Sequence, residues 1–138
     1  NIKEQMRVNA AQIKALAEGK TPKTAYYVLS YGEYGDYSVG PGSYIYELLT
    51  MAGCDFLTKN MEYAFPKFSV ETVVSQNPEI IIYDSTSCTL EQLRQAAGYK
   101  ELDAVKNGTA IAADGNKFAR PTPRAIEEAL NVAKKIWE

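Results

Sequence analysis

The sequence predicts an α/β domain, a three-layer sandwich in which helices cover both faces of a mainly parallel sheet of about four strands. Strand-like apolar segments alternate with amphipathic helical segments along the chain. The segment 79–83 is apolar almost throughout, which is typical of a strand covered on both faces in a parallel sheet. With 138 residues, the chain has the length of one domain.

The first three elements are a helix, a strand and a long loop. Residues 2–18 carry apolar side chains at helical spacing and polar side chains between them, which predicts a surface helix that ends at Gly19. Residues 24–31 are rich in aromatic and β-branched side chains and predict a buried strand. The pattern then stops, and residues 32–42 form a loop rich in Gly and Tyr.

The middle of the chain predicts two more helices and a strand. Ser43 can cap a helix that continues to about Ala52, because its hydroxyl oxygen can accept from a free backbone N–H. After a segment with only a weak signal, Ser69 can cap a helix over residues 70–76. The dipeptide Asn77-Pro78 ends that helix, and the apolar strand 79–83 follows.

The last third of the chain predicts helices around one more strand. Thr89 and Gln92 have the spacing of a capping box for a helix that continues to about Ala97. Residues 99–105 predict a short helical turn, and residues 109–113 predict a strand. The closing helix starts with Thr122 as N-cap and Pro123 at its first position.

The composition excludes several classes of protein. A net charge of -2 gives no basic excess for nucleic-acid phosphates, so nucleic acid is not an expected partner. No apolar run approaches the roughly 20 residues of a membrane span. The chain has no histidine, which excludes Ser-His and Cys-His catalytic pairs and His-based zinc sites. A secreted protein could join Cys54 and Cys88 in a disulfide, but we favour free thiols, because a domain of this size needs no disulfide.

Three loops are expected along one edge of the sheet, because ligands of parallel sheets bind at the carboxyl ends of the strands. These loops follow the strands 24–31, 79–83 and 109–113. Their aromatic rings and one guanidinium group suit a large, flat, partly anionic ligand such as a metal chelate or a tetrapyrrole. The predicted ligand contacts are Tyr31, Tyr34, Tyr37, Ser85, Phe118 and Arg120.

Each of these candidates also has a structural interpretation. The tyrosines can pack their own loop, Arg120 can form a surface ion pair of little energetic value, and Ser85 can satisfy backbone groups of its turn. Residues 35–43 superficially resemble a phosphate-binding loop, but Pro41 follows Gly40 where that motif requires Lys.

Four segments carry a family resemblance: Gly40-Pro41-Gly42-Ser43, Asn77-Pro78-Glu79-Ile80-Ile81-Ile82, residues 107–114, and Arg120-Pro121-Thr122-Pro123-Arg124. Together with the leading helix they resemble the C-terminal lobe of extracytoplasmic solute-binding proteins, which deliver iron chelates, haem or corrinoids to ABC importers. The resemblance covers nearly the whole chain, but only half of such a protein.

The resemblance implies two α/β lobes, joined by one long helix, that hold a ligand in the cleft between them. Residues 1–18 would be the end of this interlobe helix and residues 19–138 the C-terminal lobe. The N-terminal lobe is absent, so we expect an excised lobe or a fragment of a secreted protein. The implied protein is a monomeric, non-enzymatic binding protein without a cofactor, located in the periplasm or at the cell surface. A lipid anchor or the ABC permease would be its contact with the membrane.

The resemblance also bears on individual residues. Family members present a basic or polar side chain into the cleft from the loop that holds Arg120, which favours a ligand contact there. They commonly dock on the permease through one acidic residue per lobe, and in some relatives this glutamate lies where the present sequence has Gly42. Glu33 and Glu47 are the substitutes that we consider for docking. A ferric siderophore, haem, a cobamide and molybdate all remain possible ligands.

Two other functions remain open. A small flavodoxin-like domain, which binds a flavin or an anion, fits the length and the alternation of elements, and its purified form would be yellow. An enzyme that uses Asp84 or Glu33 as acid or base ranks last, because no paired carboxylate stands at a recognisable spacing.

Overall fold

A parallel sheet forms the centre of the molecule. The computed structural model describes residues 2–29, 37–86, 88–96, 98–118 and 123–137. Within these residues, four strands form one sheet in the order β2-β1-β3-β4, and each pair is parallel. The strands are β1 (Lys23–Val28), β2 (Cys54–Phe56), β3 (Ile80–Asp84) and β4 (Ile111–Ala113). The prediction of a mainly parallel sheet of about four strands is therefore confirmed.

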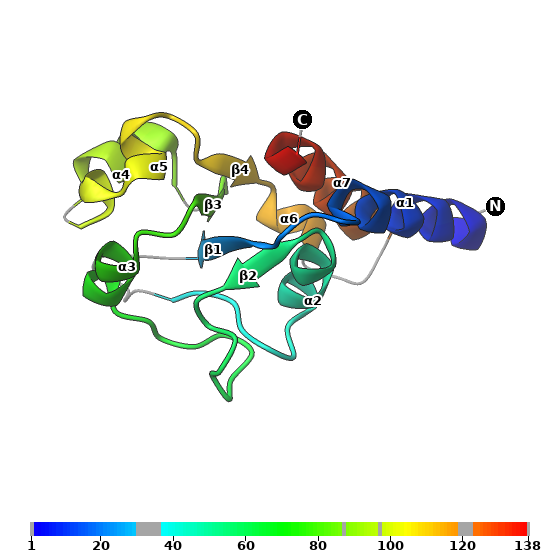
Figure 1. Cartoon of the computed structure of the whole chain (residues 1–138), viewed down its shortest axis with the longest axis horizontal. Coiled ribbons are helices and arrows are strands. Elements are labelled where there is room, and N and C mark those ends of the chain that lie inside the picture. The colour runs from blue at the N-terminus through cyan, green and yellow to red at the C-terminus, as the bar shows by residue number, and fades with distance from the viewer. Residues whose placement is uncertain (1, 30–36, 87, 97, 119–122, 138) are drawn as a thin grey trace.

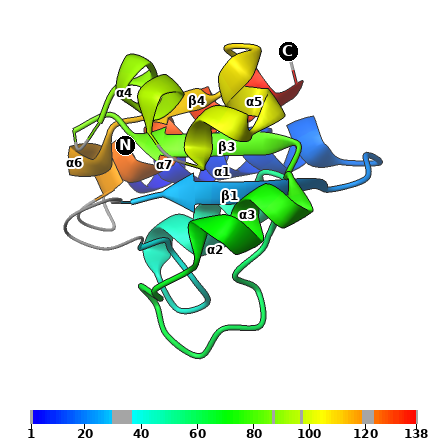
Figure 2. The ribbon, with the colours of Figure 1, turned by 90° about the vertical axis from the view of Figure 1, so that its left-hand side faces the viewer.

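Helices cover both faces of this sheet, as Figures 1 and 2 show from two directions. One layer contains α1 (Ile2–Ala17), α2 (Tyr44–Met51), α6 (Gly115–Phe118) and α7 (Pro123–Trp137). The other contains α3 (Val70–Gln76), α4 (Leu90–Gln95), the 3₁₀ helix η2 (Tyr99–Glu101) and α5 (Asp103–Lys106). The three-layer sandwich is confirmed.

Neighbouring residues of each strand face different helix layers, so the domain has two cores. On β1, Ala25 and Tyr27 pack with α1, α2 and α7, whereas Tyr26 and Val28 pack with α3, α4 and α5. On β3, Ile80 and Ile82 belong to the first core and Ile81 and Tyr83 to the second. Burial on both faces explains why the strand 79–83 shows no polar alternation in the sequence.

Several helix caps predicted from the sequence are present. The Ser43 hydroxyl accepts a hydrogen bond from the Tyr46 backbone N–H at 3.1 Å. Ser69 caps α3 in the same way, and Thr89 and Gln92 form both bonds of the predicted capping box. The predicted cap at Thr122 lies outside the described residues. These side chains fix the start of each helix because they satisfy backbone donors that have no partner within the helix.

Four elements differ from the prediction. The strand predicted over residues 24–31 is β1, which ends at Val28, and the Leu29 N–H donates to the Tyr37 carbonyl instead of joining the sheet. β2 was not predicted, because three residues at the edge of a sheet are too short to show a periodicity. Residues 114–121 were predicted as a loop, but α6 forms at their start. β4 begins at Ile111 rather than at Thr109, because the backbone N–H groups of Thr109 and Ala110 both donate to the Ala104 carbonyl instead of joining the sheet.

The two cysteines lie in different cores and are free thiols, as predicted. Cys54 is buried with the α1, α2 and α7 side chains, and Cys88 is buried with those of α3, α4 and α5. Among the described helices, none combines the length and the apolar character that crossing a bilayer would need.

Candidate functional site

The carboxyl ends of β1, β3 and β4 lie along one edge of the sheet. Val28 pairs with Tyr83, and Asp84 pairs with Ala113, so the three strands end at nearly the same level. The loops that follow them leave from this edge, as the sequence predicted. We call the described parts of these loops, residues 37–42, 84–86 and 114–118, the rim.

Asp84 connects two parts of the rim. Its side chain is buried, and its Oδ1 atom accepts hydrogen bonds from the Thr86 N–H at 2.9 Å and the Thr86 hydroxyl at 2.6 Å. The same oxygen accepts from the Gly115 N–H at 3.2 Å. A buried carboxylate needs such donors to offset its loss of hydration. The turn after β3 is therefore fastened to the start of α6.

A second buried carboxylate holds α6 from the other side. Glu128 lies on the inner face of α7, and its Oε2 accepts a hydrogen bond from the Asp114 backbone N–H at 2.6 Å. The Asp114 Oδ1 in turn accepts from the Asn116 N–H at 3.0 Å. Sequence reasoning missed Glu128; the available signal was an acidic residue among the apolar positions 125, 126, 129 and 130 of an amphipathic helix.

The Tyr27 hydroxyl lies below the rim in a buried, acidic environment. Burial raises the pKa of this phenol, and the charges of Asp84 and Glu128 raise it further. In the described part of the chain, the hydroxyl has no hydrogen-bond partner. The phenol therefore stays neutral over the physiological range, and the negative charge beneath the rim resides on the carboxylates.

The described part of the first rim loop is held by a segment that sequence reasoning had not assigned to the site. The N–H of Leu29 donates to the Tyr37 carbonyl at 3.1 Å, which returns the loop to β1. The N–H groups of Ser38 and Gly40 then donate to the carbonyls of Pro66 and Ala64, at 3.0 and 2.8 Å. These bonds attach the segment 57–68, which follows β2, to the rim.

Two exposed aromatic side chains lie on this segment. Tyr63 is 71% exposed and Phe65 is 55% exposed, unlike the other aromatic rings that pack in the two cores. Because ligands of parallel sheets bind beside the carboxyl ends of the strands, these two exposed rings are candidate contacts for a ligand or a partner. The sequence offered one signal for them, two aromatic residues in an irregular segment that ends at Pro66.

The structure describes some of the predicted contact residues and not others. Tyr31, Tyr34 and Arg120, and the docking candidate Glu33, lie outside the described residues. Tyr37 is half-buried, and its backbone forms an isolated antiparallel β-bridge with that of Lys67. Ser85 lies on the rim, with its hydroxyl donating to the Ala113 carbonyl at 3.1 Å.

The other two described candidates differ in exposure. Phe118 belongs to the rim by position, but its ring is 4% exposed and packs in the core of α1, α2 and α7. The docking candidate Glu47 is exposed, and its Oε1 lies 3.4 Å from the Gly42 backbone nitrogen, which donates to it. Among the residues described, no three His, Cys, Asp or Glu side chains lie close enough together to hold a metal ion.

Comparison with known proteins agrees with this architecture. A sequence model of the family described as periplasmic binding protein matches residues 2–116. The chain is also 25% identical over 111 residues to a cobalamin-binding protein of Halobacterium salinarum, an alignment that covers 75% of this chain and 30% of that protein. The chain belongs to the periplasmic binding protein family.

Two solved structures show the same fold. A possible iron-binding, periplasmic solute-binding protein of Staphylococcus epidermidis superposes with a TM-score of 0.81 at 19% identity, over 98% of this chain and 53% of that chain. The periplasmic heme-binding protein of Roseiflexus sp. RS-1 gives a TM-score of 0.82 at 16% identity, over 97% and 53%. The chain thus spans about half the length of these structures and less than a third of the curated relative.

Proposed function

We propose that this chain is the C-terminal lobe of a two-lobe extracytoplasmic binding protein, which captures a metal chelate or corrinoid and delivers it to an ABC permease. The observation that carries the proposal is the rim at the carboxyl ends of a parallel sheet, in a chain that matches the periplasmic binding protein family over residues 2–116. On this proposal the protein binds and releases its ligand without chemical change and needs no cofactor.

Two observations, the length of the chain and the position of α1, support the proposed lobe assignment. The chain covers 53% of the solved chains that it superposes on. In Figure 1 the N-terminal part of α1 extends away from the sheet. We assign residues 1–18 to the end of an interlobe helix and residues 19–138 to the C-terminal lobe. The missing lobe would close the cleft over the rim.

Aromatic and polar groups would form the ligand surface of this lobe. Tyr63 and Phe65 offer exposed rings beside the rim, which suit a flat macrocycle or a bulky chelate. One sequence relative is named for cobalamin and one structural relative for heme, which are ligands of this kind, and another structural relative is named as possibly iron-binding. We add Tyr31, Tyr34, Tyr37, Ser85 and Arg120 as further contacts, of which Arg120 would meet an anionic group of the ligand.

Glu47 is the better of the two docking candidates. Its exposed carboxylate reaches back to the Gly42 nitrogen, and Gly42 is where the docking glutamate of some relatives lies. The Glu47 side chain thus places a negative charge beside position 42, where this chain has an uncharged glycine. We propose that this carboxylate pairs with a basic residue of the permease, and that the protein is a monomer, periplasmic or lipid-anchored at the cell surface.

Two measurements test the proposal. An antibody against residues 1–138 would detect the native product in the source cell, and we expect a mass near twice the 15.3 kDa of this chain. Isothermal titration of that product with cyanocobalamin, haemin and a ferric hydroxamate should then identify a ligand. A native product of 15.3 kDa would exclude the two-lobe cleft. A yellow product that retains flavin would instead favour a flavodoxin-like protein.

A further inference from the structure

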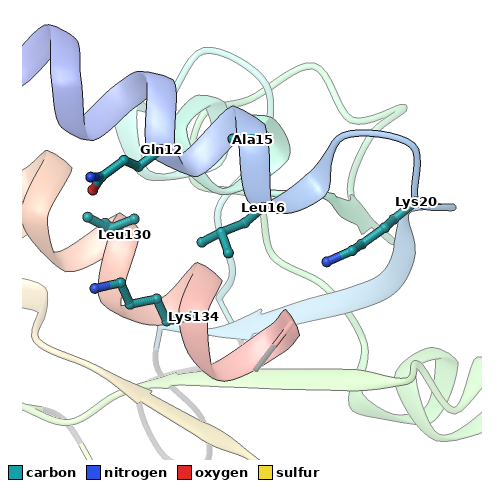
Figure 3. A pocket seen from close by; sticks show the side chains of 6 residues that line it. All are labelled: Gln12, Ala15, Leu16, Lys20, Leu130 and Lys134. Carbon is teal, nitrogen blue, oxygen red and sulfur yellow. The ribbon is translucent and has the colours of Figure 1, made fainter.

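A groove between α1 and α7 lies at the opposite end of the sheet from the rim, beside the start of β1. It has a volume of about 380 Å³ and is open to solvent. Figure 3 shows the side chains that surround it. They are Gln12, Ala15, Leu16, Lys20, Leu130 and Lys134.

The floor of the groove is apolar. Leu130 is 7% exposed and belongs to the core of α1, α2 and α7, and Leu16 packs against that core. In Figure 3 both leucine side chains point into the space between the two helices. A short aliphatic chain placed on them would remove apolar surface from water.

Two ammonium groups border this apolar floor. Lys20 follows α1 and Lys134 lies in the last turns of α7, and in Figure 3 they lie on different sides of Leu16. Within the described residues, neither lysine forms an ion pair; the pairs present are Lys59 with Asp55 and Arg94 with Glu91. The positive charges of the groove are therefore available to an anion.

The position of Lys20 is restrained by an aromatic ring. Its Nζ lies 4.9 Å from the centre of the Trp137 ring, and the Nζ of Lys23 lies at the same distance. The ring is fixed because its indole N–H donates to the Ala52 carbonyl at 2.8 Å. Cation–π contacts of this kind hold an ammonium group near one place while it keeps donors for another ligand.

We propose that this groove binds an aliphatic carboxylate, whose chain lies on Leu16 and Leu130 while its head group pairs with Lys134 and Lys20. A small inorganic anion would leave the apolar floor in water, and a neutral alkane would not use the lysines. This second site is separate from the rim and does not depend on the proposed transport function.

An NMR titration of the ¹⁵N-labelled chain with octanoate tests the proposal. For a ligand of this size on an open groove, we expect a dissociation constant of about 1 mM or lower. The shift changes should concentrate on residues 12–20 and 130–134 and on the Trp137 indole N–H. Acetate has the charge without the chain, and octanol has the chain without the charge, so both should bind at least about tenfold more weakly.

Substitutions locate the site. Lys134→Gln should weaken octanoate binding about tenfold, because a charge-assisted contact is lost at an exposed position that does not affect folding. Lys100→Gln is the matched control, since Lys100 is an exposed lysine in the opposite helix layer. The proposal is overturned if octanoate gives no saturable shifts, if octanol binds equally well, or if Lys134→Gln binds octanoate like the control.

Discussion

The Asp84 carboxylate accepts a hydrogen bond from the Gly115 backbone N–H at 3.2 Å, across the 31 residues that separate the end of β3 from the start of α6. The contact is close enough that a side chain at position 115 would overlap the carboxylate. Position 115 therefore accepts only glycine in this arrangement. Two of the three rim loops consequently depend on one buried acidic residue.

Substitution of Asp84 should destabilise the domain. Asp84→Ala removes the acceptor of three hydrogen bonds between described residues, two from Thr86 and one from Gly115, so we expect a loss of about 2 to 3 kcal/mol in the free energy of unfolding. Asp55→Ala is the control, because the exposed pair of Asp55 and Lys59 contributes at most about 1 kcal/mol. Urea denaturation measures the free energy of unfolding of both variants. If Asp84→Ala and Asp55→Ala lost the same amount, the role assigned to Asp84 would be wrong.

Glu128 and its neighbour Glu127 offer a second matched comparison on α7. Glu128 is buried and accepts from the Asp114 N–H, whereas Glu127 is exposed. Glu128→Ala should lower the unfolding free energy by about 1 to 3 kcal/mol, because a buried donor loses its charged acceptor. Glu127→Ala should change it by less than about 0.5 kcal/mol. Thermal unfolding of both variants under identical conditions would show the difference, and an unchanged Glu128 variant would exclude the bond as a support of α6.

Alkaline pH should reveal the burial of Cys54. Burial raises the pKa of this thiol from 9.0 to about 12. A raised pKa means that the folded state keeps the proton that the unfolded state loses, so stability is complete below pH 9 and decreases as the pH rises towards 12. The decrease from this thiol is about 1.4 kcal/mol per pH unit in that window.

The variant Cys54→Ala isolates this effect. It should lose some stability at every pH through its smaller side chain, but its stability should fall less steeply above pH 9 than that of the unchanged chain. Denaturant titrations at several alkaline pH values give both slopes. Parallel curves for the two chains would mean that Cys54 keeps an ordinary pKa in the folded state.

Much of the fold could be predicted from local patterns, because those patterns have local causes. The caps at Ser43, Ser69 and Thr89 depend on a hydroxyl and a backbone N–H a few residues apart, so the sequence contains the whole interaction. The apolar strand β3 was equally visible, since burial on both faces removes polar residues from it.

The elements that were missed depend on distant contacts. The three residues of β2 form a strand because they pair with Lys23, Thr24 and Ala25 of β1. The four residues of α6 are held by Asp84 and Glu128, which come from other elements. The same cause limited the candidate site: Tyr63 and Phe65 reach the rim through backbone bonds between segments 37–40 and 64–67, and no pattern within either segment encodes these bonds.

In the proposed two-lobe protein, Arg120 should contribute to the binding of an anionic ligand. If its guanidinium pairs with a carboxylate or phosphate of the ligand in a desolvated cleft, Arg120→Ala should weaken binding by about 1 to 3 kcal/mol. Arg124→Ala is the control, because Arg124 is an exposed arginine in the first turn of α7 and is not among the predicted ligand contacts. Calorimetry with the ligand identified by titration would compare them, and an unchanged affinity of the Arg120 variant would remove this residue from the site.

The proposed docking of Glu47 on a permease should depend on charge and on salt concentration. Glu47→Gln keeps the size of the side chain and an oxygen that can accept from the Gly42 N–H, but removes the negative charge. We expect association with the permease in nanodiscs to weaken about three- to tenfold at low salt. The effect is modest because ion pairs at an interface mainly raise the association rate and fix the relative orientation of the partners. The difference should shrink above about 0.15 M salt, where exposed charges are screened beyond roughly 8 Å.

The control is Glu71→Gln, which changes an exposed residue in the first turn of α3 in the other helix layer and should leave association unchanged. An equal effect of the two substitutions would show that only net charge matters, and docking would then have to be sought elsewhere on the lobe.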